Sequence, residues 1–141
     1  MIAPYLDASA IIYLVEGAAS ARGLVAARIA GAESDSNGRL LTSQLSRLEC
    51  RVKPLRAYDA SLLATYDAFF ARGRLVVVDV TTTVIDRATE LRVKYGFKTP
   101  DALHLASAIV GGADVFVTGD VALARCTDVK VEIVSPVAPA P

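Results

Sequence analysis

The stretch Ile2-Ala3-Pro4-Tyr5-Leu6-Asp7-Ala8-Ser9 decides the fold, because an apolar run ends there at an acidic residue and good helix formers follow. Residues 2–6 predict a first strand, and Ala8–Glu16 predicts the helix after it. A strand that leads directly into a helix begins a strand–helix–strand unit, which typically builds a parallel sheet. We therefore expect an α/β protein whose first strand ends at Asp7.

The rest of the chain alternates strands and helices in the same way, and it contains no internal repeat. Further strands are predicted at Arg39–Thr42, Leu75–Val80, Asp114–Thr118 and Val131–Val134. Further helices are predicted at Ala21–Ala32, after Ser43, at Ala57–Ala71 and Val84–Tyr95, from Thr99 as N-cap to Gly111-Gly112, and at Asp120–Arg125. We expect a loop at Glu33–Gly38 and a helix that ends or kinks at Pro54. The predicted fold class is a three-layer α/β/α sandwich with a mainly parallel sheet of four to five strands. Leu75–Val80, the segment richest in β-branched residues, is predicted as a central strand.

Length and composition limit the possible classes of protein. The chain has 141 residues, 53% of them hydrophobic, and no apolar run approaches the length of about 20 residues that a membrane span needs. Cys50 and Cys126 are isolated cysteines without metal-ligand spacing, which indicates reduced thiols. We expect one domain over residues 1–134, a flexible Pro/Ala-rich tail at 135–141, no membrane segment and a cytoplasmic location.

Four acidic residues stand where a predicted strand ends or a helix lies close by. They are Asp7, Glu49, Asp101 and Asp120. In open α/β sheets ligands bind at the carboxyl ends of the strands, so one topology could bring these acids together. Carboxylate oxygens are hard ligands that suit Mg²⁺ or Mn²⁺. We interpret the set as a metal-dependent site that cleaves phosphodiesters.

Each acid alone also has a purely structural explanation. Asp7 and Asp120 could cap the helices that follow them. Asp101 in a first helical turn is favoured by the helix dipole by about 0.3–1 kcal/mol. His104, the single histidine, stands one turn beyond Asp101 and is interpreted as a structural residue rather than a general base.

Glu49 is predicted to lie beside an apolar helix face made of Leu45, Leu48 and Val52. A carboxylate at the margin of a core needs a partner, because its burial alone costs several kcal/mol. Either a neighbouring arginine or a metal ion could serve.

Polar and basic residues near the acids suggest supporting roles. Ser9 and Thr118 could orient a carboxylate or a water molecule. Arg47, Arg51 and Lys98 could bind the phosphates of RNA. The alternative for each basic residue is an ordinary solvated surface position, and the balance of 15 basic and 15 acidic residues does not by itself indicate nucleic-acid binding.

Together these motifs resemble a known family. Leu6-Asp7-Ala8-Ser9, the helical Glu49, the segment Thr99–Ala106 and Val117-Thr118-Gly119-Asp120 are similar, in this order, to PIN-domain nucleases and more narrowly to VapC toxins of bacterial toxin–antitoxin pairs. The resemblance covers residues 1 to about 134. The loop at Glu33–Gly38 is longer than usual in the family, and the tail is not part of the pattern.

The resemblance implies a PIN-like fold and a Mg²⁺- or Mn²⁺-dependent endoribonuclease that cleaves RNA with metal-activated water. Asp7, Glu49, Asp101 and Asp120 match the family's acidic quartet, and Thr118 matches its polar neighbour. The resemblance also implies a small antitoxin partner and a homodimer. Surplus apolar residues on two helices could form these contacts: Leu24, Val25, Ile29, Leu62, Leu63, Tyr66, Phe69 and Phe70.

Other functions stay open at this stage. The chain could be a non-toxin PIN nuclease in RNA processing, or a metal-binding α/β module without nuclease activity. A phosphatase of the haloacid dehalogenase type would place Asp-X-Asp after the first strand, where this chain has Asp7-Ala8-Ser9. A response regulator would place paired acids there, and that pair is missing.

Overall fold

The computed structural model describes residues 2–134, so the predicted tail lies outside the described residues. Five strands form one sheet in the order β3-β2-β1-β4-β5, and every pairing is parallel. The strands are β1 (Pro4–Leu6), β2 (Leu40–Ser43), β3 (Leu75–Val78), β4 (Val115–Thr118) and β5 (Val131–Ile133). The predicted parallel sheet is therefore confirmed, with five strands.

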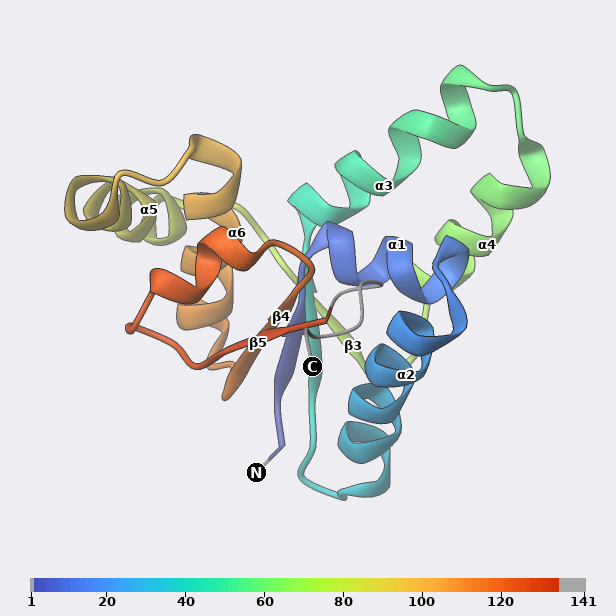
Figure 1. Cartoon of the computed structure of the whole chain (residues 1–141), viewed down its shortest axis with the longest axis horizontal. Coiled ribbons are helices and arrows are strands. Elements are labelled where there is room, and N and C mark those ends of the chain that lie inside the picture. Colours follow the sequence, from blue (N-terminus) through green and yellow to red (C-terminus); the bar gives the residue numbers. More distant parts are fainter. Residues whose placement is uncertain (1, 135–141) are drawn as a thin grey trace, which may run out of the picture.

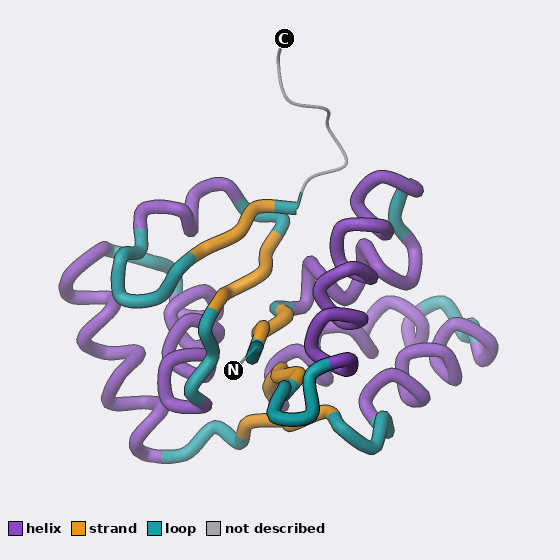
Figure 2. The backbone as a smooth tube through the Cα atoms, turned by 90° about the horizontal axis from the view of Figure 1, so that it is seen from below, coloured by secondary structure: helices purple, strands orange, loops and turns teal. Residues whose placement is uncertain are grey.

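Helices cover both faces of this sheet (Figures 1 and 2). They are α1 (Ala8–Glu16), α2 (Ala19–Ser34), α3 (Gln44–Arg56), α4 (Ala60–Phe70), α5 (Thr82–Tyr95), α6 (Thr99–Gly111) and the 3₁₀ helix η1 (Val121–Arg125). Helices α5 and α6 lie on one side, and α1, α2 and α4 lie on the other, which confirms the three-layer sandwich. Within residues 2–134 no single helix is long and apolar enough to cross a membrane, although α1 and α2 taken together, bent by 117°, would pass by length and composition.

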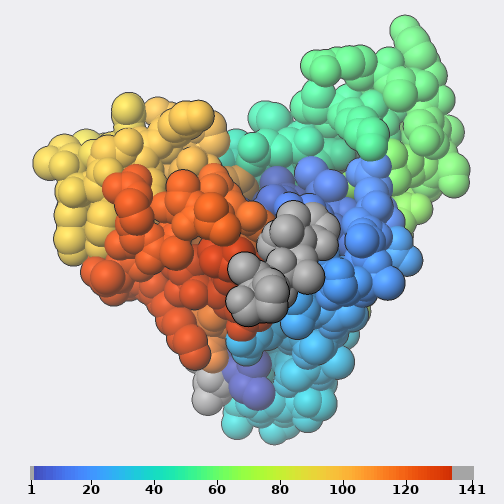
Figure 3. All heavy atoms as spheres, in the orientation of Figure 1, coloured from blue at the N-terminus to red at the C-terminus, as the bar shows by residue number. Residues whose placement is uncertain are grey.

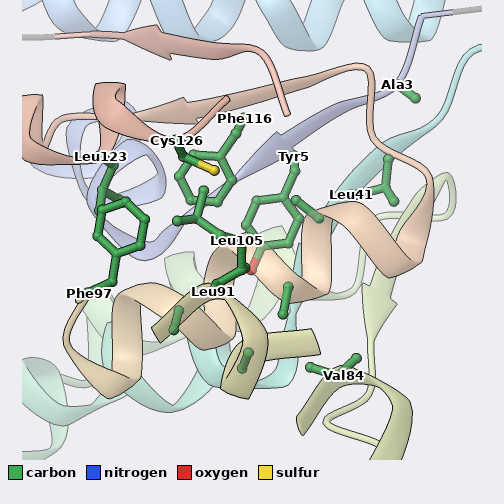
Figure 4. Close-up of a cluster of buried hydrophobic side chains, with 14 residues drawn as sticks. Ala3, Tyr5, Leu41, Val84, Leu91, Phe97, Leu105, Phe116, Leu123 and Cys126 are labelled. Carbon is green, nitrogen blue, oxygen red and sulfur yellow. The ribbon is translucent and has the colours of Figure 1, made fainter. Parts of the chain in front are cut away.

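Alternate residues of the central strand build two separate cores, as the twofold periodicity of a strand requires. Tyr5 packs with Leu105 and Phe116 in the core under α5 and α6 (Figure 4). Its neighbour Leu6 packs with Ile11 in the core under α1 and α2. Strand β1 is buried on both faces and paired with a strand on each side. It therefore fixes the position of Asp7, the residue that follows it.

The prediction of Leu75–Val80 as a central strand is wrong. Strand β3 lies at the edge of the sheet, beside β2, and Val76 is 38% exposed. A run of β-branched residues favours an extended backbone but carries no information on lateral order. The pairing of β1 with both β2 and β4 decides that order.

Several predicted boundaries also need correction. Glu33 and Ser34 belong to α2, so the predicted loop begins later. Lys98 rather than Thr99 is the N-cap of α6, and it makes no side-chain capping bond. Helix α3 does not end at Pro54, the position predicted to end or kink it, but continues to Arg56. The predicted helix end at Gly96 is confirmed, because this residue has the left-handed φ of 73° that glycine accepts without strain.

The surplus apolar surface predicted on α2 and α4 is partly taken up by the core. Val25 and Tyr66 are completely buried, and Ile29 and Phe69 are 5% and 6% exposed, whereas Leu24 remains 49% exposed. Leu62, Leu63 and Phe70 are partly buried. About half of the predicted set is therefore taken up by the core.

Helices α3 and α4 form a hairpin that stands away from the rest of the molecule (Figures 1 and 3). Its main polar tie to the body is Glu16, the last residue of α1. Lys53 Nζ donates to Glu16 Oε1 over 2.5 Å, and the Tyr66 hydroxyl donates to Glu16 Oε2. One carboxylate thus joins three helices, and the Lys53 and Tyr66 hydrogen bonds hold its pKa below the ordinary value of 4.5.

We predict that Glu16→Gln lowers the stability of the fold at neutral pH by on the order of 1 kcal/mol, a Tm decrease of about 3 °C. A depressed carboxyl pKa stabilises the fold above pH 4.5, and this contribution disappears as the pH falls through the folded-state pKa. The Tm difference between wild type and variant should therefore shrink between pH 7 and pH 3 in thermal unfolding. A difference that grows on acidification would contradict the assignment.

Candidate functional site

Asp7 stands at the carboxyl end of β1 and is 6% exposed. It caps α1, accepting from the Ala10 backbone N–H over 3.0 Å. Ser9 Oγ donates to Oδ1 and Thr118 Oγ1 donates to Oδ2, each over 2.6 Å. Asp7 is therefore both a helix cap and a carboxylate held by the hydroxyls of Ser9 and Thr118.

Asp120 and Asp101 lie at the same edge of the sheet and line one cavity of about 350 Å³. Asp120 follows β4 and caps η1 through the Ala122 backbone N–H, 2.9 Å away. Its own N–H donates to Thr118 Oγ1 over 3.1 Å, which links it to the Asp7 cluster. Asp101 stands in the first turn of α6.

The electrostatics of this edge are unfavourable for three ionised acids. Burial raises the pKa of Asp101 above its ordinary value of 3.8, and the negative charges of Asp120 and Asp7 raise it further. His104 and Lys98 act in the opposite direction but do not cancel the increase. The site therefore holds an excess of negative charge that a bound cation would relieve.

Glu49 has a different partner from those considered in the sequence. Its Oε1 lies 2.5 Å from His104 Nε2. Arg47 and Arg51 instead face Asp67, at 3.9 and 2.9 Å. Of the two partners considered for Glu49, the arginine is therefore not the one found, because α4 supplies both arginines with the Asp67 carboxylate.

The predicted apolar face of α3 is also wrong. Leu48 and Val52 are 61% and 41% exposed, and the buried positions are Ser46, Cys50 and Pro54. The helix inserts its smaller side chains against the body, so Glu49 sits half-buried next to the packed side. Burial raises the pKa of Cys50 to about 12, which keeps this thiol protonated and unreactive.

His104 has partners on both ring nitrogens. Its side chain is 5% exposed, and Nδ1 lies 2.9 Å from the Tyr5 hydroxyl. Burial raises the pKa of the Tyr5 hydroxyl, so this group remains protonated. Sequence reasoning missed Tyr5, and its only local signal was its place two residues before Asp7 on the same strand.

The four acids fit a hard divalent cation by donor type, since carboxylate oxygens are what Mg²⁺ and Mn²⁺ prefer. The crowding of charge around Asp101 fits such an ion as well. Within residues 2–134, however, no group of three or more His, Cys, Asp or Glu side chains stands close enough together to hold a metal ion. Binding would therefore need side-chain movement at this edge.

Two cations share the cavity of Asp101 and Asp120. Lys98 and Arg125 both line it. The Arg125 guanidinium lies 4.6 Å from the centre of the Phe97 ring and donates to the Tyr95 and Ala122 carbonyls. Sequence reasoning named Lys98 and missed Arg125, whose proximity to the acids depends on the turn after Asp120.

The sequence matches the PIN domain over residues 5–128. The fold is similar to that of VapBC2 from Rickettsia felis bound to a DNA fragment from their promoter, with a TM-score of 0.72, 16% identity and coverage of 93% of this chain and 98% of that chain. A toxin–antitoxin complex from Klebsiella pneumoniae has a TM-score of 0.66 and 18% identity, with coverage of 95% of this chain and 98% of that chain. Mycobacterium tuberculosis VapC20, a Sarcin-Ricin loop cleaving toxin, has a TM-score of 0.68 and 16% identity, with coverage of 86% of this chain and 93% of that chain. None of the curated proteins compared with the sequence matches it.

We predict that Asp101→Asn raises the Tm at pH 7 in the absence of divalent metal. A raised carboxyl pKa means that the ionised form costs stability, and this cost is absent below pH 3.8 and complete above the folded-state pKa. Thermal unfolding in excess chelator should therefore show a higher Tm for Asp101→Asn than for wild type at pH 7, and this difference should vanish below pH 3.8. Asp79→Asn, at an exposed acid after β3, is the matched control and should change the Tm little. A lower Tm for Asp101→Asn at pH 7 would refute the charge-crowding argument.

Proposed function

This chain belongs to the PIN domain family, and from that premise we propose that it is a Mg²⁺- or Mn²⁺-dependent endoribonuclease, the toxin of a toxin–antitoxin pair. The observation that carries the proposal is geometric: Asp7 and Asp120 follow the carboxyl ends of β1 and β4, and Asp120 lines one cavity with Asp101. The pKa of Asp101, raised by burial and by its acidic neighbours, supports a functional site at this edge. Fold similarity to toxin–antitoxin complexes supports the toxin assignment.

Asp7, Glu49, Asp101 and Asp120 would hold the divalent ion. Such an ion, when bound, supplies activation of a water molecule and charge neutralisation at the phosphate. Asp7 Oδ1 accepts from the Ser9 hydroxyl and the Ala10 N–H, whereas Oδ2 accepts from the Thr118 hydroxyl and keeps a lone pair for a cation. These hydroxyls fix the carboxylate in direction before any ligand arrives.

Basic residues beside the acids would bind the RNA backbone. Lys98 and Arg125 line the cavity of Asp101 and Asp120, so a phosphate there would meet cations and acids together. Arg125 is already ordered by its contact with Phe97, which reduces the entropic cost of binding. Arg47 and Arg51, both near Asp67, remain predicted RNA contacts of lower priority.

A groove between α1, α2 and α4 offers a place for the antitoxin partner. Its volume is about 440 Å³, and it is lined by Leu14, Val15, Arg22, Thr65, Ala68, Phe69 and Arg72. We propose that an amphipathic segment of a small antitoxin lies there, with its acidic residues facing the two arginines. The homodimer, the cytoplasmic location and the boundary at residue 134 remain predictions. Free, buried Cys50 and Cys126 agree with a reducing compartment.

We predict that Asp7→Asn and Asp101→Asn each lower RNA cleavage by more than about 100-fold without unfolding the protein, because each removes a charge from the metal site. The measurement is the cleavage rate of a fluorescent RNA in Mg²⁺ or Mn²⁺. Asp79→Asn is the matched control, since Asp79 follows β3 and bonds only to Gln44. Full activity in both variants, or in excess chelator, would overturn the proposal. Mn²⁺-dependent thermal stabilisation with no cleavage of any RNA would favour the binding-module alternative.

We predict that Lys98→Ala raises the KM for RNA and makes the slope of log KM against log salt shallower by about 0.7, the value for one lost phosphate contact on a single strand. Initial rates between about 50 and 200 mM salt provide the measurement. Lys130→Ala serves as the comparison, because Lys130 is exposed and precedes β5, at the edge of the sheet opposite the acids. Equal slopes for wild type and Lys98→Ala would exclude Lys98 as a phosphate contact.

A further inference from the structure

A chain of hydrogen bonds runs from the core of the sheet to the Glu49 carboxylate. The Tyr5 hydroxyl donates to Ser43 Oγ over 2.8 Å and lies 2.9 Å from His104 Nδ1. His104 Nε2 lies 2.5 Å from Glu49 Oε1. Ser43 and Tyr5 are completely buried, the His104 side chain is 5% exposed and that of Glu49 is 36% exposed. Only the last member of the chain reaches the surface.

We propose that His104 and Tyr5 are positioning residues that hold the Glu49 carboxylate at the acidic site, an inference that rests on the proposed function. Asp7 and Asp120 are fixed locally, since each accepts a backbone N–H at a helix start. Glu49 stands inside α3, where the backbone N–H groups are already used by the helix. Its orientation must therefore come from another side chain, and His104 supplies it.

The need for such support follows from the architecture. Helix α3 begins the hairpin whose far end projects from the molecule (Figure 1), and the Glu49 side chain on this helix is 36% exposed. A free glutamate side chain also samples many rotamers, and ordering it costs up to about 2 kcal/mol of entropy. The contact with His104 removes this freedom before substrate binds.

The same network joins Glu49 to the elements that carry the other acids. His104 lies on α6 one turn after Asp101, and Tyr5 lies on β1 two residues before Asp7. Ser43 ends β2 and caps α3, accepting from the Ser46 N–H over 3.4 Å. The Tyr5 hydroxyl thus contacts both the start of the helix that bears Glu49 and the histidine that holds its carboxylate.

The competing explanation is a purely structural role, in which His104 and Tyr5 only provide hydrogen-bond partners for each other in the core. The two ring nitrogens allow the roles to be separated. In His104→Gln the amide nitrogen can replace Nε2 and still donate to Glu49. In His104→Asn the amide can replace Nδ1 and still meet Tyr5, but it cannot reach Glu49. Tyr5→Phe removes only the hydroxyl and keeps the ring stacked on Phe116, whose centroid is 5.2 Å away.

The experiment compares these three variants with wild type and with Thr42→Val as a control. Thr42 is buried on β2, and its hydroxyl donates to the Leu6 carbonyl, so its loss tests general sheet destabilisation. Four quantities are measured: kcat and KM for RNA, the affinity for Mn²⁺ alone by electron paramagnetic resonance, and the Tm.

We predict that His104→Asn lowers kcat and Mn²⁺ affinity by about 10- to 100-fold, with little change in KM, as expected when a partner that orients a metal ligand is lost. His104→Gln should recover most of this loss, and Tyr5→Phe should show a smaller loss in the same two quantities. Thr42→Val should lower the Tm and leave kcat unchanged.

Two results would overturn the inference. One is a kcat that follows the Tm across all variants, and the other is His104→Asn retaining as much activity and Mn²⁺ affinity as His104→Gln. Failure of the proposed function gives a different result, because wild type itself would then not cleave RNA.

Discussion

The parallel pairing of β1 with a strand on each side is the constraint on which the rest of the structure depends. Parallel strands all end at the same edge of the sheet, so the residues that follow β1, β2 and β4 are brought together there. The Asp7 N–H donates to the Val117 carbonyl over 3.2 Å, which extends this pairing to the first acid itself. Without that common edge, Asp7 and Asp120 would be two unrelated helix caps.

The same edge of the sheet contains an ionised acid, Asp101, that lowers the stability of the fold. Burial and neighbouring acids destabilise ionised Asp101, while Ser9 and Thr118 hold Asp7 in a single orientation. Stability is recovered elsewhere, in the two cores on either face of the sheet and in the tie of Glu16 to the hairpin. Such a division between a strained site and a stable scaffold is typical of proteins whose site is kept for chemistry.

Glu49 shows how a residue in the interior of a helix can be oriented without a backbone hydrogen bond. Asp7 and Asp120 are fixed by backbone N–H groups, but α3 offers none at Glu49. The support instead comes through His104 and Tyr5, which belong to the same helix and strand that carry Asp101 and Asp7. The projecting hairpin thereby has one polar anchor at the site, in addition to the one at Glu16.

The sequence by itself determined the order of strands and helices, the ends of β1 and β4 at Asp7 and Asp120, and the motifs that identify the family. These features depend on local chemistry: alternation along strands, helical spacing, and capping by short polar side chains. Only the tertiary structure decided that β3 is an edge strand and that Glu49 meets His104, 55 residues away, rather than a neighbouring arginine. Local patterns predict which segments form strands and helices, but the buried face of α3, the lateral strand order and the distant partners depend on how the elements pack.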